Sequence, residues 1–258
     1  MESVDRREIV LDIAGVNHFT FATSAHWKGK NLFPKLIELV SNEKTFSDRS
    51  EVAAERVKKG LWFESDHLIA LDFLRRFGVL GAAGDRHLVE FVPWYLRSEK
   101  ELHRWGVICT PYSWRIIRSK EKAVVPTKLT PSGEEGVDQM LALLGLVPLD
   151  TNVNLPNHGQ MPDMPLGAVV ETYAQFRQNS IRPIVSAKLA PCISEAVRRV
   201  VTVQQLTLKA AMEGDIELAF QAMLADPLVT ISTDLAWKMF KEMLEYTSDY
   251  IPGQKRPK

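Results

Sequence analysis

An amide and an imidazole stand side by side at Asn17 and His18, within the largely apolar segment 13–21. A histidine in such a place could offer a ring nitrogen to a metal ion or to a substrate hydroxyl. Phe19 and Phe21 follow with the alternation of a half-buried strand. The pattern therefore predicts that Asn17 shares their face and that His18 points to the opposite one. The alternative is a lone histidine satisfied by local hydrogen bonds, and these residues leave both interpretations open.

A second polar cluster consists of Asp85, Arg86, His87 and Glu90, directly after the small-residue turn 81–84. A loop at this point can direct side chains into a cleft. Two ordinary explanations compete with a functional site. Arg86 and Glu90 are four residues apart, as in a surface ion pair on a helix, and Asp85 stands where a helix N-cap belongs.

A third cluster is rich in side-chain amides and lies around the turn-forming residues Pro156 and Gly159. Amides suit the recognition of sugar hydroxyls because each carries both donors and acceptors. Asparagine and glycine are also the usual residues of tight turns, so a purely structural loop is the alternative. The polar residues of this cluster are Asn152, Asn154, Asn157, His158 and Gln160.

The first two clusters lie next to predicted helices. Apolar residues at helical spacing predict one helix over 31–40 and another over 65–77, which Gly78 would end. Ser132 and Glu135 have the spacing of a capping box in front of a third helix.

The third cluster lies among predicted strands at 151–155, 168–172 and 181–186, with a loop rich in proline and glycine after the first. From Pro191 onward the pattern is helical, with a break at 214–215. The predicted class is therefore α+β, mostly helical, with a small mixed or antiparallel sheet.

Composition excludes several classes of function. The 258 residues are 45% apolar and 25% charged, and 32 basic side chains balance 32 acidic ones. Such a chain can bury a sizeable core, and its charge balance indicates neither nucleic acid nor an acidic membrane surface as a partner. Nothing at its start resembles a signal peptide, and no apolar run is long enough for a membrane span.

The two cysteines and the absence of a phosphate-binding motif bear on disulfide bonding and on nucleotide binding. Cys109 and Cys192 are far apart and form no CxxC pair, so they are expected to be buried thiols of a cytoplasmic protein. Neither GxGxxG nor a Walker sequence occurs. Taken alone, the chain is therefore not expected to hold a dinucleotide in the usual way.

The order of several short motifs is more specific than any one of them. Together they resemble glycoside hydrolase family 4 over nearly the whole chain, and the Gly-Asp-Arg-His variant at 84–87 resembles the branch acting on α-glucosides, α-galactosides and α-uronides. The motifs are Ala-Gly-Val-Asn-His-Phe at 14–19, Leu-Arg-Arg-Phe-Gly at 74–78, His-Leu-Val-Glu-Phe-Val-Pro-Trp at 87–94, Asn-Leu-Pro-Asn-His-Gly-Gln at 154–160, Ala-Val-Val-Glu at 168–171, and Gly-Asp at 214–215 followed by Ala-Met-Leu-Ala-Asp-Pro at 222–227.

This resemblance implies a fold like the C-terminal domain of lactate dehydrogenase and an unusual route of glycoside cleavage. In the family, NAD⁺ oxidises the sugar at C3 and Mn²⁺ polarises the resulting ketone, so that a base can remove the C2 proton. The glycosidic oxygen then leaves by elimination, water adds, and the ketone is reduced again. The family is an exception to the two-carboxylate scheme of most glycosidases.

Site roles also follow from the resemblance. It implies that His18 is the metal-binding histidine and that Asn17, its neighbour, lies at the substrate. Asp85 would be a base or an acid on the metal side, and His87 and Asn157 would contact the sugar.

Members of the family begin with a nucleotide-binding half that carries the NAD loop and a metal-binding cysteine, whereas the resemblance here starts just before His18. The expectation is a single substrate-side domain over 1–258, completed by a nucleotide-binding partner chain and assembled as a homo-oligomer. The alternative is a catalytically inactive, truncated homologue that serves as an oligomerisation or sugar-binding module.

Overall fold

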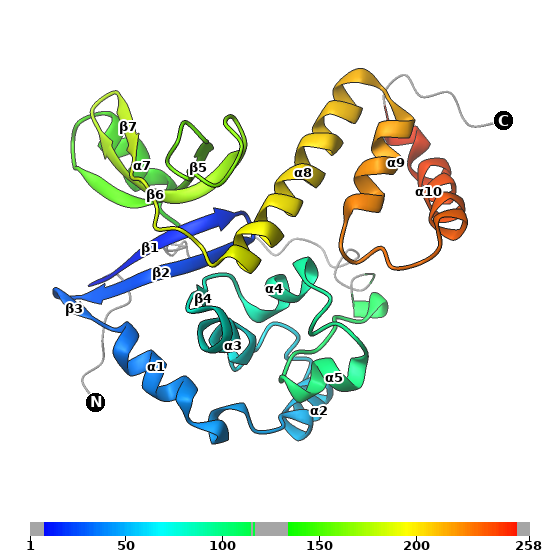
Figure 1. The fold of residues 1–258 in the computed structure, drawn as a ribbon, viewed down its shortest axis with the longest axis horizontal. Coiled ribbons are helices and arrows are strands. Elements are labelled where there is room, and N and C mark those ends of the chain that lie inside the picture. The colour runs from blue at the N-terminus through cyan, green and yellow to red at the C-terminus, as the bar shows by residue number, and fades with distance from the viewer. Residues whose placement is uncertain (1–7, 115, 117–133, 252–258) are drawn as a thin grey trace, which may run out of the picture.

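An antiparallel sheet and the helices packed on it form the body of the protein in the computed structural model, which describes residues 8–114, 116 and 134–251 (Figure 1). The strands are β1 (Ile9–Val16), β2 (Phe19–Trp27), β3 (Lys30–Asn31), β4 (Leu80–Gly81), β5 (Leu149–Pro156), β6 (Val169–Arg177) and β7 (Ser180–Pro183). The helices are α1 (Phe33–Ser41), α2 (Ser50–Lys59), α3 (Leu68–Phe77), α4 (Asp85–Phe91), α5 (Glu99–Arg104), α7 (Gly136–Leu143), α8 (Pro191–Glu213), α9 (Ile216–Ala225) and α10 (Thr233–Thr247), with 3-10 turns η2 (Glu43–Phe46) and η3 (Ser248–Tyr250).

The sheet joins two parts of the chain that are far apart in sequence. Its strand order is β3-β2-β1-β6-β5, with β4 added beside β2 and β7 beside β6. Every pair is antiparallel, and β1 meets β6 where Ala14 lies opposite Thr172 and Gly15 opposite Glu171. The predicted α+β class, mostly helical with a small antiparallel sheet, is therefore confirmed.

The strand predicted to run through Asn17 and His18 is instead a hairpin that turns at these two residues. Val16 pairs with Phe19 across the two-residue turn, and Asn17 and His18 are both exposed. The prediction that Asn17 shares the face of Phe19 and Phe21 is wrong, because the chain reverses before the alternation reaches it. Both phenylalanines are fully buried, so the part of the prediction that concerned them holds.

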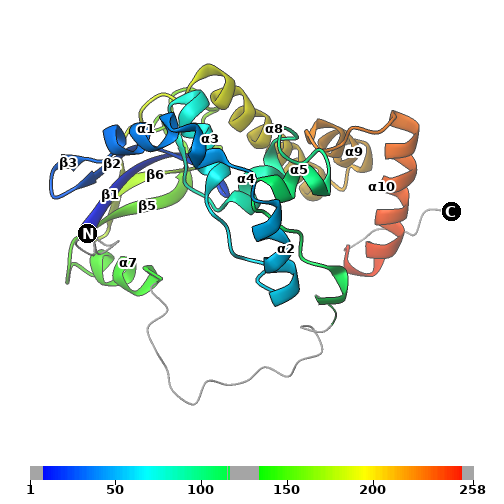
Figure 2. The ribbon, with the colours of Figure 1, turned by 90° about the horizontal axis from the view of Figure 1, so that it is seen from below.

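The main core lies between the β1–β2 hairpin and helices α3, α4 and α8. Phe19 and Phe21 pack against Phe73 of α3, and α4 adds Leu88 and Val89 to the same cluster. The buried residues of the long helix α8 pack against this core. The helix then extends toward α9 and α10, which have a hydrophobic cluster of their own (Figures 1 and 2). Helix α7 packs against the β5–β6 region in a smaller cluster.

Helix ends follow the signals in the sequence. Gly78 and Gly214 adopt left-handed conformations that end α3 and α8, as glycine after a helix does. Asp215 accepts a hydrogen bond from the Leu218 N–H and so caps α9. The capping-box prediction is partly outside the described residues, because Ser132 belongs to the undescribed segment. Glu135 itself occupies the N-cap position of α7 rather than its first turn.

Gly15 cannot be replaced without disturbing the hairpin that presents His18. Its φ is +154°, and a Cβ there would lie 2.3 Å from the Phe19 carbonyl oxygen. We expect Gly15→Ala to lower the free energy of unfolding by about 2–3 kcal/mol, through overpacking and backbone strain. Urea unfolding measures this change. Gly136→Ala is the matched control, because a Cβ there meets nothing within 4 Å, and equal stability of both variants would contradict the prediction.

Two further observations concern features predicted from the sequence. Cys109 and Cys192 are both exposed, which corrects the prediction of buried thiols: apolar neighbours in sequence do not cover either side chain in the fold. Among the helices that the structure describes, none combines the length and the apolar composition that a membrane crossing requires.

Candidate functional site

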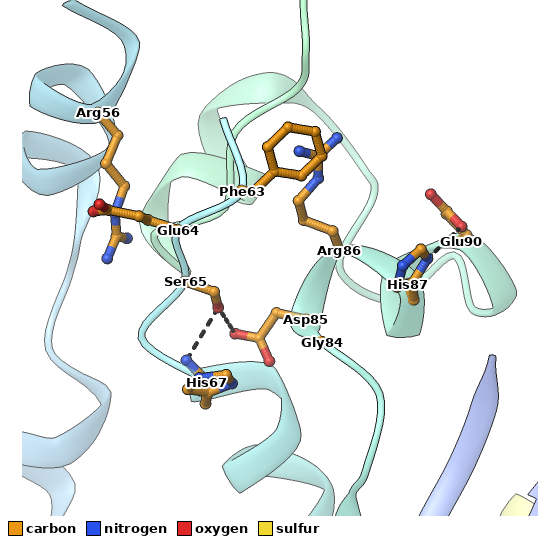
Figure 3. Close-up of a pocket in the computed structure, with 10 residues that line it drawn as sticks. All are labelled: Arg56, Phe63, Glu64, Ser65, His67, Gly84, Asp85, Arg86, His87 and Glu90. Atoms are coloured by element: carbon orange, nitrogen blue, oxygen red, sulfur yellow. Dashed lines mark hydrogen bonds and ion pairs between the residues drawn. The ribbon is translucent and has the colours of Figure 1, made fainter. Parts of the chain in front are cut away.

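A cavity of about 540 Å³ lies between the start of α4 and the segment that connects α2 to α3 (Figure 3). This volume is within the usual range of small-molecule sites. The second predicted cluster, Asp85 to Glu90, makes up much of its wall. The lining residues are Arg56, Phe63, Glu64, Ser65, His67, Gly84, Asp85, Arg86, His87 and Glu90.

His87 lines one edge of this cavity, and His18 lies beside His87 although 69 positions separate them in the sequence (87 − 18). The hairpin turn presents His18, and the first turn of α4 presents His87. Their ring centroids are 4.5 Å apart, and both side chains belong to exposed residues. Asn17 shares the turn with His18 and is also exposed, so the structure brings three of the predicted site residues to one place.

Glu90 lies next to His87 on the same helix. Its Oε2 is 3.4 Å from Nδ1 of His87, which leaves the other ring nitrogen, Nε2, available for a different partner. A carboxylate beside one nitrogen fixes the orientation of an imidazole and favours a proton on that nitrogen. Nε2 is therefore the ring nitrogen that His87 can offer to a ligand.

Asp85 lines the cavity, yet its side chain is turned inward and is 0% exposed. The carboxylate accepts hydrogen bonds from Ser65 Oγ at 2.7 Å, the Ala70 N–H at 3.0 Å and the Ile69 N–H at 3.3 Å. It thus caps the first turn of α3, not that of α4, where Gly84 takes the N-cap position. The prediction that Asp85 caps the helix that it begins is wrong, and these contacts do not support its use as the reacting base.

The side chain of Arg86 extends toward Phe63 (Figure 3). Its guanidinium lies 4.7 Å from the ring centre of Phe63, donates to the carbonyl of Trp62, and donates from Nη2 to Thr110 Oγ1 at 2.8 Å. The alternative of a surface ion pair with Glu90 does not hold, because Glu90 lies beside His87.

Asn157 organises the loop that follows β5. Its side-chain NH₂ donates to the carbonyls of Met161, Met164 and Pro165, and its oxygen accepts from the N–H groups of Gly159 and Met161. The residue is 1% exposed. These contacts support the structural alternative for the third cluster, since a substrate contact would require some of these bonds to break.

Glu171 is a residue that the motif pattern contained but to which it assigned no role. It pairs with Gly15 across the β1–β6 ladder and is partly buried near His18. Burial raises the pKa of the Glu171 carboxyl, while a hydrogen bond from Asn154 and the proximity of His18 oppose the shift. The signal in the sequence was the motif at 168–171, but its link to His18 depends on strand pairing.

The residues fit one part of the metal site that the resemblance implies. His18 offers an exposed imidazole, and His87 stands beside it. Among the described residues, however, no group of three or more His, Cys, Asp or Glu side chains is arranged to hold a metal ion. His18 can therefore supply one ligand, and the remaining ligands would have to come from elsewhere.

Comparison with known proteins identifies the family of the chain. Residues 13–229 match the family described as the C-terminal domain of family 4 glycosyl hydrolases. The chain is 42% identical to an alpha-galacturonidase of Thermoanaerobacterium saccharolyticum, over 99% of this chain and 57% of that protein. It is 37% identical to an alpha-galacturonidase of Thermoanaerobacter italicus, over 96% of this chain and 56% of that protein. The chain thus spans little more than half the length of these relatives.

Solved structures have the same fold. The crystal structure of the lplD protein of Bacillus subtilis superposes with a TM-score of 0.78 at 35% identity, covering 95% of this chain and 57% of that one. A 6-phospho-beta-glucosidase of Thermotoga maritima, solved with manganese, NAD⁺ and glucose-6-phosphate, superposes with a TM-score of 0.65 at 18% identity, over 97% of this chain and 55% of that one. This chain belongs to family 4 of the glycosyl hydrolases and corresponds to the C-terminal domain of the family.

Proposed function

We propose that this domain forms the substrate and metal side of a glycoside hydrolase that acts on α-linked uronides. The observation that carries the proposal is the contact of His18 with His87, which lines the cavity. Similarity to proteins named alpha-galacturonidase, at 42% and 37% identity, supports the substrate class.

We assign a role to each of the exposed side chains of Asn17, His18 and His87. His18 would bind Mn²⁺, and a bound Mn²⁺ would act as a Lewis acid on a sugar oxygen. Asn17 can donate to and accept from a sugar hydroxyl, since its amide is exposed beside His18. His87, oriented by Glu90, would hold or move a proton at Nε2. Asp85 would hold the start of α4 against the start of α3 through its hydrogen bonds.

The sequence contains no GxGxxG motif for NAD, and no step of the proposal passes through this cofactor. We propose that the nucleotide-binding part of the working enzyme comes from residues outside this sequence, on the same polypeptide or on another. This would explain why the chain aligns with 57% of its relative. The alternative of an inactive oligomerisation or sugar-binding module and the cytoplasmic location stay predictions.

Self-association also stays a proposal, and α10 supports it. Ala236 and Phe240 of this helix are buried against α9, whereas Leu235, Met239 and Met243 are exposed. A row of exposed apolar side chains on one helix is typical of a surface that another protein covers.

The test is a calorimetric titration of the whole chain with Mn²⁺ in the presence and absence of galacturonate. We expect His18→Ala to abolish binding, because a metal site rarely survives the loss of a histidine ligand. His158→Ala is the matched control, since His158 is exposed but does not line the cavity. Unchanged binding in His18→Ala would contradict the proposal, and no binding by the wild-type chain would favour the inactive module.

A further inference from the structure

We propose that Arg86 recognises the carboxylate of the uronic acid residue that enters the cavity, and so selects acidic over neutral sugars. The inference rests on the proposed function, since it names the group that sets the substrate preference of the same site. It depends on the charges that line the cavity and on how the guanidinium of Arg86 is held.

The charged side chains around the cavity differ in the groups that hold them. Arg56 forms an ion pair with Asp66, 2.8 Å between Nη2 and Oδ1, and the carboxylate of Asp85 is occupied by Ser65 and the start of α3. Glu90 lies beside His87. Of the two arginines that line the cavity, Arg86 is the one without a carboxylate partner: its hydrogen-bond acceptors are a carbonyl and a hydroxyl, both neutral.

The guanidinium of Arg86 is held in place before any ligand arrives. One hydrogen bond to Trp62 and one to Thr110 fix its plane, while the ring of Phe63 covers one face at 4.7 Å. Arginine has five N–H donors in a rigid fork, so these two bonds leave donors for a further acceptor. A pre-ordered fork loses little entropy on binding, and the aromatic cover reduces competition from water.

A carboxylate is the acceptor that suits this arrangement. Two oxygens in a plane can take two parallel N–H donors of one guanidinium, which neutral hydroxyl groups match less well. Arg86 is also adjacent in sequence to His87, and both lie in the first turn of α4 and line the cavity (Figure 3). A sugar ring bound beside His18 and His87 could therefore direct its C6 carboxylate toward Arg86.

A phosphate group on a sugar is also an anion that a guanidinium can bind, and the experiment separates a phosphate from a carboxylate. Dissociation constants of the whole chain are measured, with saturating Mn²⁺, for D-galacturonate, its methyl ester, D-galactose and galactose 6-phosphate. We expect wild type to bind galacturonate about 10- to 100-fold more tightly than the ester or galactose, as for a hydrogen bond to a charged group. Tighter binding of the phosphate than of galacturonate would overturn the assignment to a carboxylate.

Variants assign the preference to Arg86. In Arg86→Met the affinity for galacturonate should fall to within about twofold of the affinity for galactose. Arg86→Lys should retain part of the difference, because lysine keeps the positive charge but lacks the planar pair of N–H donors. Arg104→Met removes the same charge from a residue that does not line this cavity and should keep the full preference. Because Arg86 also holds Trp62 and Thr110, thermal unfolding and galactose affinity report whether each variant is intact, and Arg86→Lys serves if Arg86→Met fails to fold.

The experiment distinguishes a failure of the Arg86 assignment from a failure of the proposed function. Equal affinity of wild type for galacturonate and galactose would overturn the role of Arg86 but leave the proposed sugar site standing. A full preference retained in both Arg86 variants would overturn it equally. If wild type bound none of the four sugars, the inference and the proposed function would both be contradicted.

Discussion

Asp85→Ala is expected to lower the free energy of unfolding by about 3 kcal/mol, because three hydrogen bonds to a fully buried carboxylate are lost together. Two of the donors are N–H groups in the first turn of α3, which have no partner inside the helix. Without the carboxylate these groups would stay buried and unsatisfied. Urea unfolding followed by circular dichroism measures the loss, and no substrate or cofactor is needed.

Two variants calibrate this prediction. Ser65→Ala removes one of the three donors and should cost about 1 kcal/mol, as for a single hydrogen bond. Asp85→Asn keeps one oxygen acceptor and should lie between Ser65→Ala and Asp85→Ala. If Asp85→Ala is as stable as wild type, the carboxylate does not cap α3, and the implied role as a catalytic acid or base becomes the better explanation of this residue.

Much of the fold could be predicted from local signals, because each depends on neighbouring residues. Gly78 and Gly214 end helices where glycine can take the left-handed conformation, and Asp215 caps the helix that it begins. Strand β5 lies within two residues of the predicted strand at 151–155, whereas the predicted strand at 168–172 covers only the first part of β6. The hairpin turn at Asn17 was missed because the sequence around it carries no Asn-Gly or Asp-Gly signal.

The site could be predicted only in part, because its contacts join distant segments. His18 and His87 were each selected from the sequence, but their 4.5 Å approach results from packing α4 on the hairpin. Asp85 carries a cap for a helix that begins 17 positions earlier (85 − 68), and no local pattern indicates that. The stack of Arg86 on Phe63 and the pairing of Glu171 with Gly15 are likewise tertiary.

Phe19→Ala is expected to have the largest effect on stability, a loss of about 3–5 kcal/mol, because it removes a fully buried aromatic ring and leaves a cavity. The ring lies 4.9 Å from Phe21 and 4.9 Å from Phe91, centre to centre, so it joins the hairpin to α4. The loss is measured by urea unfolding. Phe19→Leu, which keeps most of the apolar volume, should cost clearly less.

The same variant tests whether the core positions the site. Phe19 directly follows His18, and Phe91 is on the helix that carries His87. If packing of these rings holds the two histidines 4.5 Å apart, Phe19→Ala should weaken Mn²⁺ and galacturonate binding at temperatures where the chain is still folded, and amide hydrogen exchange in α4 should become faster. A variant that is less stable but binds both ligands as well as wild type would show that the hairpin turn alone places His18. The contact between the hairpin and α4 would then contribute to stability and not to the geometry of the site.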